Sequence, residues 1–127
     1  MGLLQEVWPK DMKLIIAGSR DIWIQCDELF EIIDKFGILY QIEEIVSGCA
    51  AGIDSSAITF ANRYRIPLKK FPADWAKYGG LAGPRRNREM AEYSDCLLLI
   101  WDGKSRGSAN MKARMKGLGK QIFEVVK

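Results

Sequence analysis

Histidine is absent from this sequence of 127 residues, and only three cysteines are present, with no C-x-x-C pair among them. Structural zinc sites are built from closely spaced cysteine and histidine ligands, so we expect no metal centre and no bound cofactor. Without histidine, a general acid or base would have to be a carboxylate, namely Asp54, Asp74, Glu89 or Asp102. The widely spaced Cys26, Cys49 and Cys96 are interpreted as reduced thiols that pack as small apolar groups.

Long apolar runs are also missing, since no stretch comes near the ~20 residues that a membrane-spanning helix needs. Residues 1–11 lack the basic start and apolar run of a secretion signal. We therefore expect a cytoplasmic protein with no membrane partner. The length predicts one domain over residues 1–127, with a core at 13–126 and an N-terminal extension at 1–12. The apolar residues of this extension predict either a docked extra turn or a contact in a homodimer or higher homo-oligomer.

Charge is divided unevenly along the chain, although the net charge is only +3. Residues 1–75 hold eight basic and eleven acidic side chains, whereas residues 76–127 hold eleven basic and five acidic ones. A basic half attracts anionic partners, including nucleic acid. Its arginines lie in turns punctuated by glycine rather than in a stripe interleaved with aromatic residues. This pattern favours a small anionic ligand, with nucleic acid as a less favoured partner.

Strand-like and helix-like segments alternate throughout the chain. Five short segments are predicted as strands, at 13–17, 43–47, 68–71, 96–101 and 121–126. Those at 13–17 and 96–101 are the apolar runs typical of strands buried on both faces. Amphipathic helices are predicted between them, marked by Leu29, Ile33 and Phe36, by 54–64, by Pro84 to about Tyr93, and by Met111, Met115 and Leu118. A glycine-rich loop precedes Pro84. The alternation predicts an α/β, Rossmann-like three-layer domain with a five-stranded parallel sheet in the order 3-2-1-4-5.

Three segments place glycine or a small hydroxyl residue where a predicted strand ends and a helix begins: 17–20, 47–54 and 103–108. Helix N-termini offer free backbone N–H groups, and glycine lets an anion approach them closely. The first and third segments meet at the switch point of the predicted sheet, where open sheets of this kind bind ligands. The residues expected to bind a phosphorylated ligand are Gly18, Ser19, Arg20, Gly48, Gly52, Asp54, Arg86, Asn87, Asp102, Lys104, Ser105, Arg106, Gly107 and Ser108.

Side-chain chemistry predicts the arrangement within this site. A phosphate is expected on the helix that begins at Gly107 and Ser108, between the guanidinium forks of Arg20, Arg86 and Arg106. The glycines and small residues of the first two segments would form the floor.

The sugar and base of a nucleotide need other partners. Asp102 or Asn87 would meet a ribose hydroxyl. Trp75 and Tyr78, in the loop before Pro84, either stack on a nucleobase or pack beneath the loop.

Five motifs follow one another over about residues 13–126: Gly18-Ser19-Arg20, Ser47-Gly48 through Gly52-Ile53-Asp54, Phe71-Pro72-Ala73-Asp74-Trp75, Ala82-Gly83-Pro84 with Arg86-Asn87 and Met90, and Trp101 through Ser108. In this order they resemble the YspA/YpsA-related branch of the SLOG superfamily, which also includes the lysine-decarboxylase-like LOG enzymes and the DNA-processing Smf/DprA proteins. The resemblance implies a Rossmann-like fold that binds nucleotides or nucleotide-derived ligands, including NAD-derived ones, in conflict between phages and bacteria. Compact forms of this kind are similar to versions found in phage and prophage genomes.

The chain departs from the family pattern at several positions. In the second motif Ala51 stands where an arginine is usual, and Cys49 stands where a glycine is usual. Ser108 replaces a common threonine and keeps the hydroxyl. Asn87 and Met111 stand where the LOG enzymes have a lysine and a glutamate. The last two differences argue against LOG-type phosphoribohydrolase chemistry and favour binding.

Three functions follow as hypotheses. The first is a protein that senses or sequesters a nucleotide-like ligand. The second is a hydrolase of an N-glycosidic or phosphoanhydride bond, with Glu89 or Asp54 as the catalytic carboxylate. The third is a DNA-binding module like the Smf/DprA proteins, whose affinity would fall steeply with salt.

Overall fold

The computed structural model describes residues 10–127. Residues 1–9 of the predicted N-terminal extension lie outside the described residues, and with them the expected extra turn or oligomer contact. Met12, which the sequence places in the extension, belongs to the first strand.

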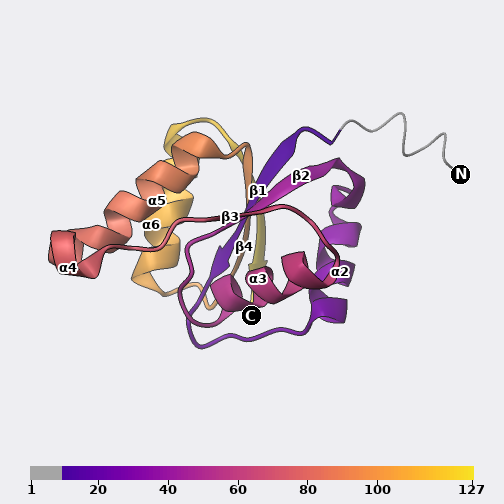
Figure 1. Cartoon of the computed structure of the whole chain (residues 1–127), viewed down its shortest axis with the longest axis horizontal. Helices are drawn as coiled ribbons and strands as arrows, with labels where there is room; N and C mark the ends of the chain where they lie inside the picture. The colour runs from indigo at the N-terminus through magenta and orange to yellow at the C-terminus, as the bar shows by residue number, and fades with distance from the viewer. Residues whose placement is uncertain (1–9) are drawn as a thin grey trace, which may run out of the picture.

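A sheet of five parallel strands forms the centre of the molecule (Figure 1). The strands are β1 (Met12–Gly18), β2 (Ile42–Ser47), β3 (Leu68–Lys70), β4 (Cys96–Trp101) and β5 (Gln121–Val126). Their order is β3-β2-β1-β4-β5, and every neighbouring pair is parallel, which confirms the predicted α/β Rossmann-like architecture. The strand order reverses between β1 and β4, so a crevice opens beyond the carboxyl ends of these two strands.

Helices cover both faces of this sheet, as Figure 1 shows. The helices α2 (Cys26–Lys35) and α3 (Ile53–Arg63) pack on one face, and α5 (Ala82–Tyr93) and α6 (Arg106–Gly117) pack on the other. Shorter elements connect them: the 3-10 turns η1 (Leu39–Gln41) and η2 (Gly79–Leu81) and the one-turn helix α4 (Trp75–Tyr78).

Alternate residues of the central strands enter two separate cores. In β1, Leu14 and Ile16 contact the core beneath α2 and α3, whereas Ile15 and Ala17 contact the core beneath α5 and α6. All six residues of β4 are buried. Burying each large apolar side chain contributes about 1.5–3 kcal/mol, so these two strands form the most stable frame on which a site can be built.

The structure differs from the prediction in the segment before α5. A glycine-rich loop is expected up to Pro84, whereas α4 and η2 occupy this segment and α5 already begins at Ala82. The carboxylate of Asp74 accepts a hydrogen bond from the Lys77 backbone N–H at 3.0 Å and so caps α4. One helical turn is too short for apolar periodicity, so the sequence pattern could not reveal it.

Three residues expected on the apolar stripes of helices are at helix ends instead. Phe36, Tyr64 and Leu118 are the C-caps of α2, α3 and α6 and are 37%, 38% and 50% exposed. Their spacing matches the helical period, but the chain leaves the helix at these positions, so their side chains are only partly covered. The ring of Tyr64 still packs against the buried Phe60, and that of Phe36 packs against Phe123.

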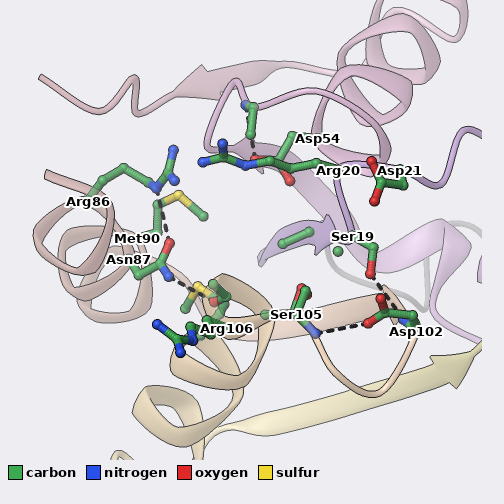
Figure 2. A pocket seen from close by; sticks show the side chains of 16 residues that line it. Ser19, Arg20, Asp21, Asp54, Arg86, Asn87, Met90, Asp102, Ser105 and Arg106 are labelled. Atoms are coloured by element: carbon green, nitrogen blue, oxygen red, sulfur yellow. Dashed lines mark hydrogen bonds between the residues drawn. The ribbon is translucent and has the colours of Figure 1, made fainter. Parts of the chain in front are cut away.

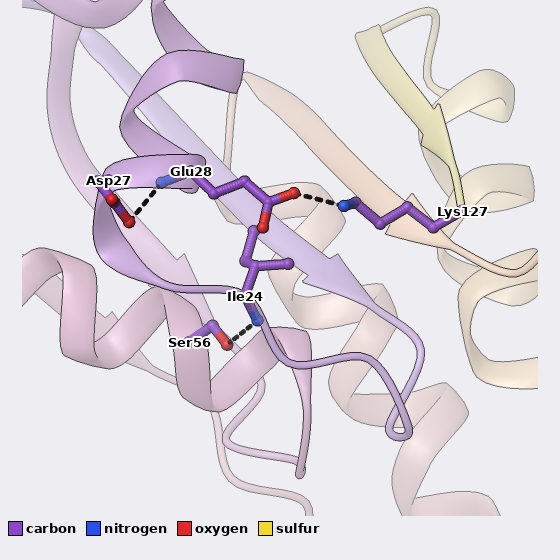
Figure 3. Close-up of polar contacts among 5 residues, drawn as sticks. All are labelled: Ile24, Asp27, Glu28, Ser56 and Lys127. Carbon is purple, nitrogen blue, oxygen red and sulfur yellow. Dashed lines mark hydrogen bonds and ion pairs between the residues drawn. The ribbon is translucent and has the colours of Figure 1, made fainter.

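Figure 3 shows the contacts that hold the loop between β1 and α2, and the first turn of α2, against neighbouring elements. The Ser56 hydroxyl of α3 accepts a hydrogen bond from the Ile24 backbone N–H at 3.2 Å. Lys127, just beyond β5, forms an ion pair with Glu28 of α2. The backbone N–H of Lys127 also donates to the Trp101 carbonyl at 2.8 Å. These contacts fix the last residue of the chain beside α2.

Candidate functional site

A pocket of about 350 Å³ lies beyond the carboxyl ends of β1 and β4, between the first turn of α6 and the side of α5 (Figure 2). Its position is the crevice that the strand order predicts. The residues that line it are Ala17, Gly18, Ser19, Arg20, Asp21, Ala50, Asp54, Arg86, Asn87, Met90, Asp102, Ser105, Arg106, Gly107, Ser108 and Met111.

The first turn of α6 supplies unsatisfied donors to this pocket. Within the described residues, the backbone N–H groups of Arg106, Gly107 and Ser108 have no hydrogen-bond acceptor, as expected for a helix N-terminus. The Ser108 hydroxyl is also without a partner, although Ser108 is only 4% exposed. The Ser105 hydroxyl is likewise buried and unpartnered. A buried hydroxyl without a partner is costly, and an anion at this turn would satisfy both hydroxyls and the N–H groups.

Two guanidinium groups face one another across the opposite wall of the pocket, as Figure 2 shows for Arg20 and Arg86. Arg86 is half-buried and donates a hydrogen bond to the Gly48 carbonyl. Burial lowers the pKa of Arg86, the carboxylate of Asp54 opposes this shift, and the charge of Arg20 adds to it. The two arginines therefore repel one another in the empty pocket, and an anion between them would remove that repulsion.

Asp54 is the buried counter-ion of this arginine pair. It is 5% exposed, and its carboxylate accepts a hydrogen bond from the Ala50 backbone N–H at 3.2 Å. Burial raises the pKa of Asp54, while the Ala50 N–H and the charges of Arg86 and Arg20 oppose the shift. Ser47 donates to the Asp54 carbonyl at 2.9 Å and fixes the turn before α3. Asp54 thus holds the loop and Arg86 in place from beneath the pocket.

Asn87 connects α5 to α6 and lines the pocket. Its amide nitrogen donates to the Gly107 carbonyl and to the Asn110 side chain, both at 3.1 Å. Its oxygen accepts a hydrogen bond from Arg86 Nε at 3.0 Å. Both amide protons are used by these bonds, whereas the oxygen can accept one more. The contact between Asn87 and a ribose stays a prediction, in which a ribose hydroxyl would donate to this oxygen.

Acidic groups gather at the other end of the pocket from the arginines (Figure 2). Asp102 accepts hydrogen bonds from the backbone N–H groups of Lys104 and Ser105, at 2.8 and 2.9 Å, through a single oxygen. These two bonds lower the pKa of Asp102, and the neighbouring Ser19 hydroxyl adds to the shift. Asp21, which the sequence analysis does not single out, lines the same end. The pocket is thus polarised, with cations at the end next to α5 and hydrogen-bond acceptors at the end next to β1.

Two of the glycines predicted to form the floor of the pocket, Gly18 and Gly52, are required by close backbone packing. A Cβ on Gly18 would lie 1.7 Å from the Ile100 carbonyl oxygen, so only glycine allows β1 to approach β4 here. Gly52 has φ +72°, and its Cβ would lie 2.4 Å from the Ser19 carbonyl oxygen and 2.5 Å from that of Arg20. Gly18 lines the pocket, whereas Gly52 is buried beneath it.

Gly48 and Gly107 have different surroundings. A Cβ on Gly48 would lie 2.7 Å from a terminal nitrogen of Arg86, so this glycine makes room for the guanidinium. Gly107 has no atom within 4 Å of the position of a Cβ. No packing contact therefore requires glycine at 107.

The structure does not bring every predicted residue to the pocket. Glu89 is exposed and pairs with Arg85 at 3.8 Å on the outer face of α5, so it is remote from the proposed sugar position. Lys104 is exposed and is not among the lining residues. The buried Met90 and Met111 form an apolar wall that the sequence analysis does not assign to the site.

Two kinds of feature are not found in the described part of the chain. No group of acidic and cysteine side chains within residues 10–127 is arranged to hold a metal ion. Every helix in that range is too short or too polar to span a bilayer.

Comparison with known proteins reveals a likeness in fold. No family model matches the sequence, and no curated protein matches it. Among solved structures, the X-ray structure of DNA processing protein A (DprA) from Streptococcus pneumoniae superimposes with a TM-score of 0.71 and 20% sequence identity. The match covers 98% of this chain and 53% of DprA, so the chain spans about half the length of that protein. The likeness shows a shared Rossmann-like fold, which is the fold that the resemblance to the SLOG superfamily implies.

Proposed function

We propose that the pocket binds a phosphorylated small molecule of the nucleotide class, and that the protein senses or sequesters this ligand. The observation that carries the proposal is the Ser108 hydroxyl, which is buried, has no partner and lines the pocket at the N-terminus of α6. A phosphate oxygen at this turn would accept hydrogen bonds from that hydroxyl and from the free backbone N–H groups.

The charges around the pocket support a phosphate at this end. The two facing guanidinium groups of Arg20 and Arg86 carry two positive charges, and the single buried carboxylate of Asp54 interacts with both of them. Arg106 adds a third cation at the first turn of α6. The carboxylates of Asp102 and Asp21 line the other end and suit ribose hydroxyls, because hydroxyl groups donate to carboxylates.

Binding is favoured over turnover because the proposed catalytic carboxylates are poorly placed. Glu89 is paired on the outer face of α5. Asp54 is buried and already bonded to Ala50. Hydrolysis of an N-glycosidic or phosphoanhydride bond therefore has weaker support than binding, and a nucleotide panel assayed for product as well as for affinity tests it directly.

The substitution Ser108→Ala tests the proposal, with Ser94→Ala as its matched control. Both hydroxyls are buried and unpartnered, but Ser94 is the C-cap of α5 and does not line the pocket. Removing an unsatisfied buried hydroxyl should leave the free energy of unfolding unchanged or raise it in both variants. Calorimetric titration with ribose 5-phosphate should show affinity reduced roughly tenfold to hundredfold in Ser108→Ala alone, since a hydrogen bond to a charged group is lost. Equal affinity in the two variants, or no binding of ribose 5-phosphate or AMP by the wild type, contradicts the proposal.

Nucleic-acid binding is the second candidate. The helices α5 and α6 carry the exposed basic residues Arg85, Arg88, Arg106 and Lys116, of which Arg106 lines the pocket. The printed description of DprA, which shares the fold, names DNA processing. A backbone-bound single strand loses affinity steeply with salt, by a slope of roughly −0.7 per phosphate contacted. Titration with a 20-nucleotide oligothymidylate between low and high salt distinguishes this from a single phosphate site, whose salt dependence is shallow.

A further inference from the structure

A second hollow adjoins the phosphate pocket on the far side of the two arginines. It has a volume of about 330 Å³. Its walls are formed by Arg20, Gly48, Cys49, Ala50, Ala51, Pro72, Ala73, Trp75 and Arg86. Arg20, Ala50 and Arg86 line both hollows, so the two spaces lie next to one another on either side of these residues.

Trp75 provides an aromatic surface in this second hollow. Its side chain is 51% exposed, which is unusual for so large an apolar group. A Cβ on Gly83 would lie 3.3 Å from Cη2 of the indole, so the ring packs against a glycine of α5 on one side. The ring stands on the first residue of α4, which Asp74 caps. It is therefore held in place by α4 and α5 while part of its surface stays open.

We propose that this hollow receives the planar base of a nucleoside 5′-phosphate, which stacks on the indole of Trp75 while its phosphate lies at the first turn of α6. The proposal rests on the proposed function and deepens it by assigning the position of the base. The small apolar walls at Ala51, Pro72 and Ala73 suit a flat ring. The guanidinium groups of Arg20 and Arg86 lie between the two spaces and contact base and phosphate together.

Two further aromatic side chains, Tyr78 and Trp23, lack this relation to the phosphate pocket. The ring of Tyr78 is covered by the Arg85 guanidinium, whose central carbon lies 4.3 Å from the ring centre. Trp23 is 63% exposed but lines a separate hollow between α2 and α3, and that hollow shares no residue with the phosphate pocket. Trp75 alone of these three lies in a hollow next to the pocket. Purines, which offer the larger stacking surface, should bind more tightly there than pyrimidines.

The test compares ligands with and without a base. Ribose 5-phosphate and AMP are titrated calorimetrically into the wild type, Trp75→Ala, Trp75→Phe and the matched control Trp23→Ala. We expect the wild type to prefer AMP by roughly five- to hundredfold, the usual contribution of one stacked base. Trp75→Ala should lose this preference and keep its affinity for ribose 5-phosphate. Trp75→Phe should keep part of the preference, and Trp23→Ala should keep all of it.

Indole fluorescence gives an independent readout. AMP should quench the emission of the wild type and of Trp23→Ala, whereas ribose 5-phosphate should not, and Trp75→Phe should lose most of the quenching. Preference for AMP that survives in Trp75→Ala overturns the base position while leaving the phosphate site standing. Equal affinity of the wild type for AMP and ribose 5-phosphate also overturns the base position and leaves the phosphate site standing. Failure of both ligands to bind the wild type overturns the proposed function and this inference together.

Discussion

Replacing Gly107 by alanine should separate ligand binding from folding. Gly107 is the second residue of α6, and no atom lies within 4 Å of the position of its missing Cβ. Alanine is favoured over glycine inside a helix by roughly 0.5–1 kcal/mol. The variant should therefore unfold at a temperature about 2–6 °C higher than the wild type.

The same methyl group should obstruct the ligand. The Cα–Cβ bond of a helical residue tilts toward the helix N-terminus, so the new Cβ would point to the turn where the phosphate is proposed to lie. An anion held away from that turn loses at least one charge-assisted hydrogen bond, which corresponds to roughly tenfold to hundredfold in affinity. Calorimetric titration with AMP and a thermal melt monitored by circular dichroism measure the two effects on the same sample.

Gly117→Ala is the matched control for this substitution. Gly117 is the last residue of α6, also has open space at its Cβ position, and does not line the pocket. The substitution Gly117→Ala should raise the unfolding temperature and leave the affinity for AMP unchanged. If Gly107→Ala binds AMP as tightly as Gly117→Ala does, the phosphate does not lie at this helix N-terminus and the reasoning fails.

Two further predictions concern the frame of the site. In urea titrations, Gly52→Ala should lower the free energy of unfolding by about 1–3 kcal/mol more than its control Gly37→Ala. Both glycines have positive φ, but only a Cβ at position 52 would meet backbone oxygens. Equal losses in the two variants would contradict this prediction. Burial, with a smaller effect of Asp95, raises the pKa of the Cys96 thiol from 9.0 to about 12. The folded value exceeds the unfolded one, so the resulting stability is present below pH 9.0 and is lost as the pH rises toward about 12. Iodoacetamide at pH 9 should therefore label Cys96 only after unfolding, as mass spectrometry of peptides can check; labelling at the rate of Cys26 in the native protein would refute it.

Much of the frame could be predicted from the sequence because the central strands are buried on both faces and therefore appear as apolar runs. The continuous apolar run at 96–101 matches β4 residue for residue, and the predicted strand at 121–126 matches β5, an edge strand that is only partly buried. Strand order followed from the alternation of strands and helices and from the handedness of crossovers. The one-turn helix α4 was missed because it depends on a single side-chain cap by Asp74 rather than on periodicity.

The site was harder to predict from the sequence, since its contacts join residues that are distant along the chain. Asn87 was expected to meet a ribose, and its partners Gly107 and Asn110, which were not expected, lie on another helix, about 20 residues away. Glu89 was a catalytic candidate by residue type alone, and the neighbouring turn of the same helix gives it Arg85 as a partner. The signal that was available for Asp21 is its place immediately after Arg20, beyond a buried strand.

The position of the last residue has a practical consequence. Lys127 follows β5 at the carboxyl edge of the sheet, where its N–H bonds to Trp101 and its side chain pairs with Glu28. The pocket opens at this same edge, whereas the described chain enters β1 at the opposite edge. Any segment joined after Lys127, whether a purification tag, a fluorophore or a further domain, therefore starts at the edge of the sheet where the pocket opens. A fluorophore attached there reports from the ligand-binding edge, whereas one attached at Lys10, just ahead of β1, reports from the opposite edge.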